Sequence, residues 1–301
     1  MLLFACTIFT SAFLLFLVQP IVAKEILPWF GGSAAVWTTC LVFFQVALLA
    51  GYAYTDVTTR KLKPRAQVLL HVALLAASLA LLPIIPDATW KPAGSEDPGL
   101  RILGLLVATI GLPYFLLATT GPLVQAWFAR AFPLGTVYRL FALSNLASML
   151  ALISYPFAFE PWVTTAFQAK AWSAGHALFA VLCAATALFS LRNAAIPAVA
   201  ATPGADAQQP QAAPAPSRFD LFLWLALPAM GSWMLLAITN HITQNIASIP
   251  FLWLVPLALY LLTFILCFDS DAWYQRSWLL GPTAVILGFC AWGLQTSDVT
   301  L

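Results

Sequence analysis

Long apolar stretches recur along this chain from Leu2 to Leu294, and the short segments between them hold nearly all of its charge. With 62% hydrophobic and only 8% charged residues, a water-soluble chain of 301 residues could not hide this much apolar surface in one core. A membrane-spanning helix needs about 20 mostly apolar residues. Nine such windows cover residues 3–23, 33–54, 66–86, 101–127, 137–158, 172–191, 219–240, 247–268 and 277–295. The sequence therefore predicts an all-α, polytopic transmembrane bundle of nine spans, with the lipid bilayer as its surroundings.

The basic residues predict how the chain crosses the membrane. With a cytoplasmic N-terminus, nine Lys and Arg residues fall on the cytoplasmic side and four on the outside, as the positive-inside rule favours. The inner group is Arg60, Lys61, Lys63, Arg65, Arg130, Arg139, Arg192, Arg218 and Arg276, and the outer group is Lys24, Lys91, Arg101 and Lys170. The first apolar segment lacks the basic start of a signal peptide, so we expect it to be retained.

A change in composition divides the chain into two parts. Residues 193–217 are rich in Ala, Pro and Gln and have no periodic apolar face, which predicts a disordered cytoplasmic linker. The linker separates a six-helix bundle in residues 1–192 from three further transmembrane helices in residues 218–301. Six spans followed by a loose loop are typical of one half of a major facilitator-type transporter. We therefore expect a facilitator-like half and a shorter second part.

The connection between the second and third spans is similar to a cytoplasmic loop of facilitators. It begins at Gly51, carries Asp56 and ends in Arg60 and Lys61. In that family such an acidic residue and its basic neighbours latch adjacent helix ends. Asp56, Arg60 and Lys61 are therefore predicted to form a cytoplasmic latch, and a charged turn that obeys the positive-inside rule is the alternative.

Three longer stretches carry a more distinctive resemblance. They are FLVQPIVAKEILPWFGGSAAVW at residues 16–37, YRLFALSNLAS at 138–148 with the Tyr-Pro pair that follows, and the segment from Thr239 through residues 249–260. These stretches resemble the membrane region of bacterial proteins in which a facilitator-type part is fused to a spermidine synthase-like part. The resemblance implies a bacterial inner membrane, a soluble aminopropyltransferase-like domain as partner and a polyamine-related metabolite.

No catalytic motif is found in the chain itself. Gly31-Gly32 lies between two spanning segments, and no Gly-rich turn follows a predicted strand, so no donor-binding residue or cofactor is predicted here. The five cysteines all lie in apolar segments without metal-ligand spacing, and no metal site is predicted. The net charge of +2, without a basic aromatic surface, argues against a nucleic-acid partner.

A first group of candidate substrate-binding residues surrounds the end of the first span. Pro20 removes a backbone donor and is expected to kink this helix, beside Gln19, Lys24 and Glu25. Glu160, at the outer end of the fifth span, is a further carboxylate on the same side. An amide, an ammonium and carboxylates at a broken helix end can bind a polar molecule. The alternative is that Lys24 only extends to the membrane interface.

A second group follows the seventh span. Asn240, His241 and Gln244 belong to the densest uncharged polar cluster of the chain and are predicted to line an outward-facing vestibule together with Gln19 and Lys24. A simple loop is the alternative.

Three functions remain open at this point. The leading hypothesis is a membrane module that handles or transports a small polar metabolite. A membrane anchor or scaffold for a catalytic domain or a complex is the second. The third is a redox subunit in which His71, His176 or His241 ligate haem, which requires two facing histidines.

Overall fold

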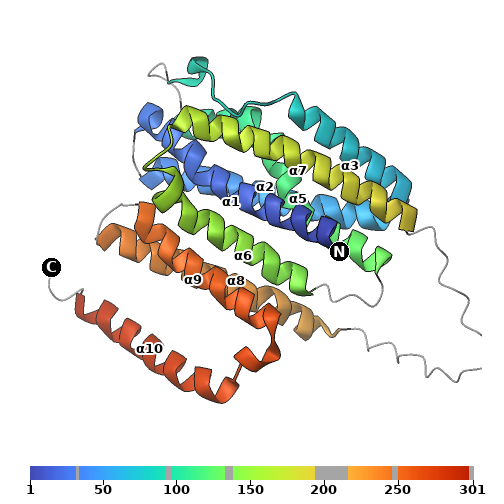
Figure 1. Ribbon diagram of the computed structural model, residues 1–301. Coiled ribbons are helices and arrows are strands. Elements are labelled where there is room, and N and C mark those ends of the chain that lie inside the picture. Colours follow the sequence, from blue (N-terminus) through green and yellow to red (C-terminus); the bar gives the residue numbers. More distant parts are fainter. Residues whose placement is uncertain (32–33, 93–96, 133–137, 194–215, 246–249, 298–301) are drawn as a thin grey trace, which may run out of the picture.

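The computed structural model describes the chain except residues 32–33, 93–96, 133–137, 194–215, 246–249 and 298–301. All regular structure in the described residues is helical (Figure 1). The first part contains α1 (Leu2–Phe30), α2 (Ala34–Lys61), α3 (Pro64–Leu79), η1 (Ala88–Trp90), α4 (Pro98–Leu106), η2 (Val107–Gly111), α5 (Leu112–Ala131), α6 (Tyr138–Ser154), η3 (Tyr155–Phe159) and α7 (Thr165–Asn193). The second part contains α8 (Arg218–Asn245), α9 (Pro250–Asp269), η4 (Asp271–Trp273) and α10 (Arg276–Ser297). The predicted linker falls almost entirely outside the described residues.

Six helices are long and apolar enough to cross a bilayer, counted over the described residues. They span Leu2–Phe30, Thr38–Lys61, Pro98–Ala131, Tyr138–Phe159, Thr165–Asn193 and Arg218–His241. The predicted all-helical class is therefore confirmed, with six candidate membrane-spanning helices, whereas the count of nine spans stays a prediction. The apolar window predicted at residues 66–86 extends beyond its helix, because α3 ends at Leu79, ahead of Pro83. A proline disfavours helical geometry in the residue before it.

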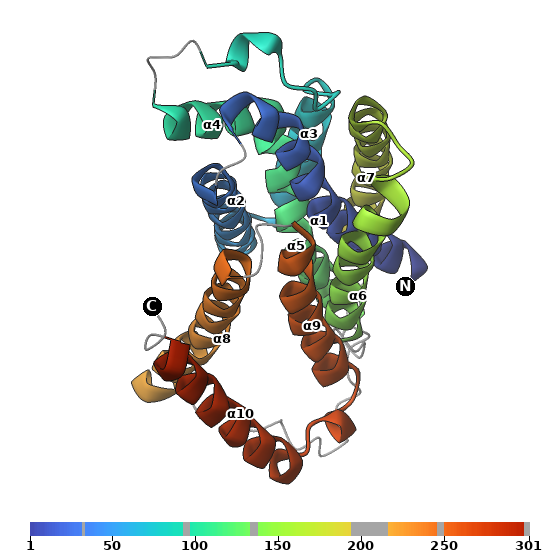
Figure 2. The same cartoon turned by 90° about the vertical axis from the view of Figure 1, so that its left-hand side faces the viewer.

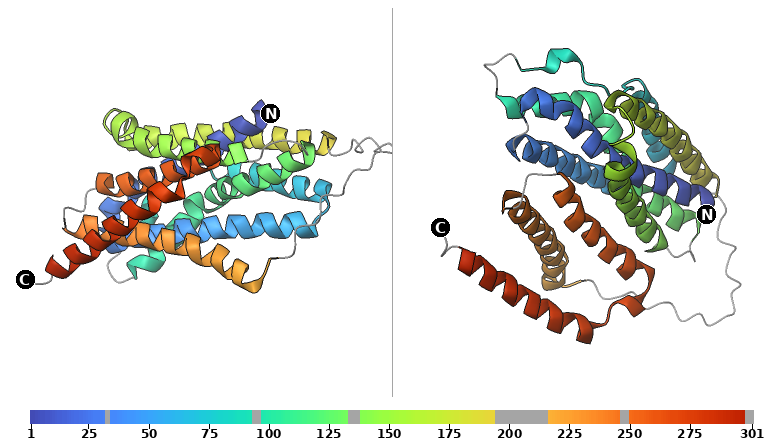
Figure 3. Two further views of the ribbon diagram at one scale, coloured as in Figure 1. Left: turned by 90° about the horizontal axis from the view of Figure 1, so that it is seen from below. Right: turned by 60° about the vertical axis from the view of Figure 1, so that its left-hand side comes forward.

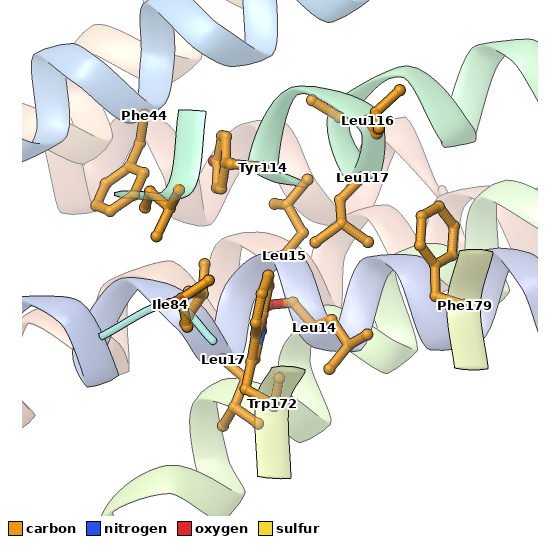
Figure 4. Close-up of a cluster of buried hydrophobic side chains, with 14 of the residues drawn as sticks. Leu14, Leu15, Leu17, Phe44, Ile84, Tyr114, Leu116, Leu117, Trp172 and Phe179 are labelled. Carbon is orange, nitrogen blue, oxygen red and sulfur yellow. The ribbon is translucent and has the colours of Figure 1, made fainter. Parts of the chain in front are cut away.

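Helix α1 forms the centre of the first part and packs against α5, α6 and α7. Figure 4 shows the side chains of Leu14 and Leu17 on α1 next to Trp172 on α7, with Leu15 directed towards Leu117 on α5. Trp172 is 1% exposed, and its Nε1 donates to the carbonyl oxygen of Leu14 at 2.8 Å. Apolar packing and one buried hydrogen bond therefore fix α7 against α1.

The remaining helices surround this centre. Helix α2 packs on α4 and α5, and α3 packs on α7 and α5. The second part meets the first where α9 packs along α6, and Phe141 of α6 stacks on Phe268 of α9 with ring centroids 5.3 Å apart. Helix α8 packs on α9, and α10 lies on the far side of both (Figures 2 and 3).

Helices α2 and α5 lie close together at Gly51. A Cβ atom at Gly51 would lie 2.9 Å from the Cβ of Ala118 and 3.0 Å from the backbone nitrogen of Thr119. One turn along, the Thr55 hydroxyl donates to the carbonyl oxygen of Thr119 at 3.3 Å. The absence of a side chain at Gly51 therefore sets the spacing of this helix pair.

We expect Gly51→Val to push α2 away from α5 and to lower the free energy of unfolding by about 1–3 kcal/mol, the usual cost of overpacking. Thermal unfolding of the purified protein in detergent measures the loss. Gly288→Val is the matched control, because a Cβ at Gly288 in α10 has nothing within 4 Å. Equal unfolding temperatures for the two variants would contradict the close approach.

Candidate functional site

The candidate site lies along α1 from Gln19 onward. Pro20 has no backbone N–H, so the carbonyl oxygen of Phe16 loses its helical partner. Gln19 Nε2 donates to the Tyr114 hydroxyl at 3.4 Å, and the Tyr155 hydroxyl donates to the carbonyl oxygen of Pro20, also at 3.4 Å. Tyr155 begins the π-helical turn η3, and Tyr114 lies in the first turn of α5, three residues after the π-helical turn η2. Such wide turns are frequent at functional sites, and here they bring two hydroxyl groups to one stretch of α1.

An ion pair joins Lys24, in the last third of α1, to Glu160, the residue that follows η3. Lys24 Nζ lies 3.2 Å from Glu160 Oε1, and the two side chains are 40% and 45% exposed. The backbone N–H of Glu160 donates to the carbonyl oxygen of Tyr155 at 2.8 Å, which closes the π-helical turn. Lys24 and Glu160 are 136 positions apart in the sequence. The structure therefore brings together two of the predicted binding residues, with Gln19 on the same helix.

Glu25 belongs to a separate hollow. Its neighbour Lys24 contacts η3, whereas Glu25 lines a hollow between α1, the segment before η1 and the start of α7. The cavity volume is about 30 Å³, and the other lining residues are Ile21, Val22, Ile84, Ile85, Pro86, Ala166 and Ala169. This volume suits one or two water molecules. The mainly apolar hollow is too small for a whole metabolite.

The second predicted group lies near the end of α8. Asn240 and His241 are exposed on this helix, and the side chain of Gln244 lies outside the described residues. Helix α8 packs on α9. A vestibule that these residues share with Gln19 and Lys24 stays a prediction.

A covering segment, made of η1 and the start of α4, lies at the end of the bundle that holds Lys24. The guanidinium of Arg101, in α4, donates to three consecutive backbone carbonyl oxygens, those of Thr89 at 2.7 Å, Trp90 at 2.9 Å and Lys91 at 3.1 Å. Lys91 Nζ lies 5.3 Å from the ring centroid of Trp29, near the end of α1, in a cation–π contact. These contacts hold the segment around η1 against α1 and α4.

Two carboxylates cap the helices of this covering segment. Asp87 Oδ1 accepts a hydrogen bond from the backbone N–H of Thr89 at 2.9 Å, and Asp97 Oδ1 accepts one from Gly99 at 2.8 Å. Both are N-cap interactions. The hydrogen bond from Thr89 lowers the pKa of the exposed Asp87 carboxyl below its ordinary value, since it favours the charged form.

At the opposite end of the bundle, the predicted latch residues lie on one helix. Arg60 Nε lies 2.6 Å from Asp56 Oδ1, one turn apart within α2, and both side chains are more than half exposed. Lys61 is also exposed, at the end of the same helix. The contact between Asp56 and Arg60 is therefore local, and a latch to a neighbouring helix stays a prediction.

The helix ends there are joined instead by Gln67, which the sequence analysis did not single out. Gln67 is 0% exposed, and its Oε1 accepts from Trp127 Nε1 at 3.3 Å and from both Nη atoms of Arg130 at 3.2 Å. Its Nε2 donates to the hydroxyls of Thr59 at 2.9 Å and Thr58 at 3.4 Å. One amide therefore connects α3 to α2 and α5. The sequence held one signal for this role, since Gln67 is an amide side chain within the apolar window 66–86.

Two predicted haem ligands lie between α3 and α7. His71 Nε2 lies 3.6 Å from Cys183 Sγ, and His176 Nε2 lies 3.0 Å from Ser78 Oγ. Both rings are 0% exposed. The antiparallel helices place the two histidines at levels separated by seven residues, about 10 Å along the axis. Each histidine thus pairs with a small side chain across the helix interface, which is the arrangement expected of a packing contact.

The comparisons with known proteins give no match. No protein-family model, no curated protein and no solved structure matches the chain. The resemblance to fused facilitator and synthase-like proteins therefore stays a prediction.

We expect Gln67→Ala to leave Trp127 and Arg130 without their buried acceptor and to lower the free energy of unfolding by about 2–3 kcal/mol. Thermal unfolding in detergent measures this loss. Gln67→Glu keeps the acceptor and is expected to lose less. Gln275→Ala, at an exposed position before α10, is the control. If Gln67→Ala unfolds at the same temperature as that control, Gln67 does not hold the helices together.

Proposed function

We propose that this protein binds a small polar metabolite at the Lys24 end of the bundle and carries it across the membrane. The observation that carries this proposal is the gathering of three polar contacts on one kinked stretch of α1: Gln19 to Tyr114, Tyr155 to the Pro20 carbonyl, and Lys24 to Glu160. Polar and ionisable groups are costly within a membrane and mark binding sites and transport routes. Interrupted helices with exposed backbone groups form substrate sites in transporters.

The order of helix contacts supports a facilitator-like first part built from two inverted repeats. In this proposal α1, α2 and α3 correspond to α5, α6 and α7, with α4 and η2 leading into α5. Helix α1 packs on α6 as α5 packs on α2, and α1 packs on α7 as α5 packs on α3. Helices α1 and α5 also pack on each other, as do α3 and α7. Two inverted three-helix repeats are related by a two-fold axis, so each contact between the repeats has a counterpart in which the corresponding helices are exchanged.

The buried residues of α3 and α7 support the same repeat. Gln67, His71 and Ser78 on α3 have the spacing of Trp172, His176 and Cys183 on α7, and all six are at most 1% exposed. The contact of His71 with Cys183 corresponds to the contact of His176 with Ser78. A two-fold axis between the two helices would exchange these pairs.

In the full proposal the chain crosses a bacterial inner membrane nine times, with its N-terminus in the cytoplasm. The six long spans, the two shorter apolar helices α3 and Leu254–Asp269 and the 22-residue α10 supply the nine helices. The charge distribution supports the orientation, because it places the Lys24 and Glu160 end outside.

We also propose that the membrane part works with a spermidine synthase-like soluble domain. The three motif stretches at residues 16–37, 138–148 and 239–260 support this partner. Reading the continuation of the coding sequence for a strand followed by a Gly-rich turn tests whether the two parts are fused.

A membrane scaffold is the second candidate function. The hollow beside Glu25 favours it, because about 30 Å³ is far below the roughly 300–1,000 Å³ of usual ligand sites. A scaffold needs no cavity, and α1 is packed on several sides. Binding or flux of a metabolite decides between the two functions.

We expect Gln19→Ala to reduce uptake into proteoliposomes at least about fivefold, since losing a polar contact at a binding site costs about 1 kcal/mol. The test compounds are radiolabelled amino acids, amines and carboxylates. Gln45→Ala is the matched control, because Gln45 is an exposed glutamine within the membrane segment of α2. Absence of binding and flux for every compound in the unmodified protein would contradict transport and favour the scaffold.

A further inference from the structure

Resting on the proposed function, we propose that the Lys24–Glu160 pair selects a zwitterion, a small molecule that carries both an ammonium and a carboxylate group. The pair presents one positive and one negative group 3.2 Å apart, and Lys24 lies about one helical turn after Pro20. A zwitterion matches both charges at once. Its carboxylate binds Lys24, and its ammonium binds Glu160.

The pair has unused hydrogen-bonding capacity. An ammonium group has three donors, and a carboxylate has two oxygens that each accept more than one hydrogen bond. The single contact within the described residues joins Lys24 Nζ to Glu160 Oε1. Two donors of Lys24 and the Oε2 atom of Glu160 are therefore available to a ligand, and side-chain exposures of 40% and 45% leave both groups accessible.

Most other charges at this end are engaged in holding the covering segment. Arg101 binds three backbone carbonyl oxygens, and Lys91 lies over the ring of Trp29. Asp87 and Asp97 cap η1 and α4. The accessible ion pair between helices in the described residues is thus the one formed by Lys24 and Glu160.

The charge arrangement disfavours a ligand of one sign. A diamine would meet the Lys24 ammonium 3.2 Å from the carboxylate that it has to bind. A ligand with only a carboxylate group would bind Lys24 and would then lie close to the negative charge of Glu160. Like charges at this distance repel, and each such ligand would satisfy only half of the pair.

The pair contributes little to folding, which makes the inference testable by substitution. Half-exposed ion pairs add little net stability because solvent screens them. A ligand that bonds to the free donors of Lys24 and to Oε2 of Glu160 would bridge the two groups, and the fold would be retained.

The test uses the full chain in lipid nanodiscs and measures binding of alanine, propylamine, propionate and a diamine, putrescine. We expect alanine to bind at least about tenfold more tightly than propylamine, propionate or putrescine. Lys24→Gln should lower alanine affinity about tenfold and spare propylamine, and Glu160→Gln should lower it equally and spare propionate. The double variant with Lys24→Glu and Glu160→Lys should regain alanine binding. Lys170→Gln, exposed at the same end, is the control.

The outcomes separate this inference from the proposed function. Preference for putrescine, propylamine or propionate in the unmodified protein overturns the zwitterion and leaves metabolite binding intact. Equal loss of all compounds in both single variants, with unchanged thermal unfolding, likewise overturns selection by the pair. Absence of binding by the unmodified protein, together with absence of flux, contradicts the proposed function itself.

Discussion

The structure depends on one constraint, that polar groups inside a bilayer find their partners within the protein because no water is available there. Helices meet this requirement for the backbone. Several buried side chains meet it across helix interfaces, as when Ser11 on α1 donates to the carbonyl oxygen of Leu117 at 3.0 Å and the Thr7 hydroxyl lies 2.8 Å from that of Thr186. These contacts, with the bond from Trp172 to α1, hold both α5 and α7 against α1, and α5 and α7 also pack on each other. The position of α1 in turn determines which residues its polar groups Gln19 and Lys24 can contact.

The candidate site lies where α1 departs from regular helical bonding. Pro20 interrupts the hydrogen-bond ladder, and Tyr114, in the first turn of α5, and Tyr155, at the start of η3, both contact this stretch of α1. Local irregularity in all three elements thus concentrates polar atoms in one region of an otherwise apolar bundle. The same turn η3 ends next to Glu160, and this explains how a carboxylate far along the chain reaches Lys24.

The sequence was sufficient to predict an all-helical chain with helices long and apolar enough to span a membrane, because apolar windows are a local property. It also singled out the residues around Pro20, where Gln19 and Lys24 make contacts to other helices. It named Lys24 and Glu160 separately, but their pairing depends on the π-helical turn, which has no clear sequence signal. Lys24 and Glu25 were grouped as one site, yet successive helical residues differ by about 100° in direction and so meet different neighbours. Asp56 and Arg60 contact each other within α2, which their spacing of four residues already favours.

We propose that the helices alternate through the membrane and place the Arg60 end and the Lys24 end on opposite sides, the former in the cytoplasm. Cysteine accessibility tests it most directly, with Lys61→Cys or Lys170→Cys introduced into a chain whose five native cysteines are replaced. A membrane-impermeant maleimide applied to intact cells should label position 170 only, and position 61 should react after the cells are opened. Labelling of both positions from the same side would contradict the account.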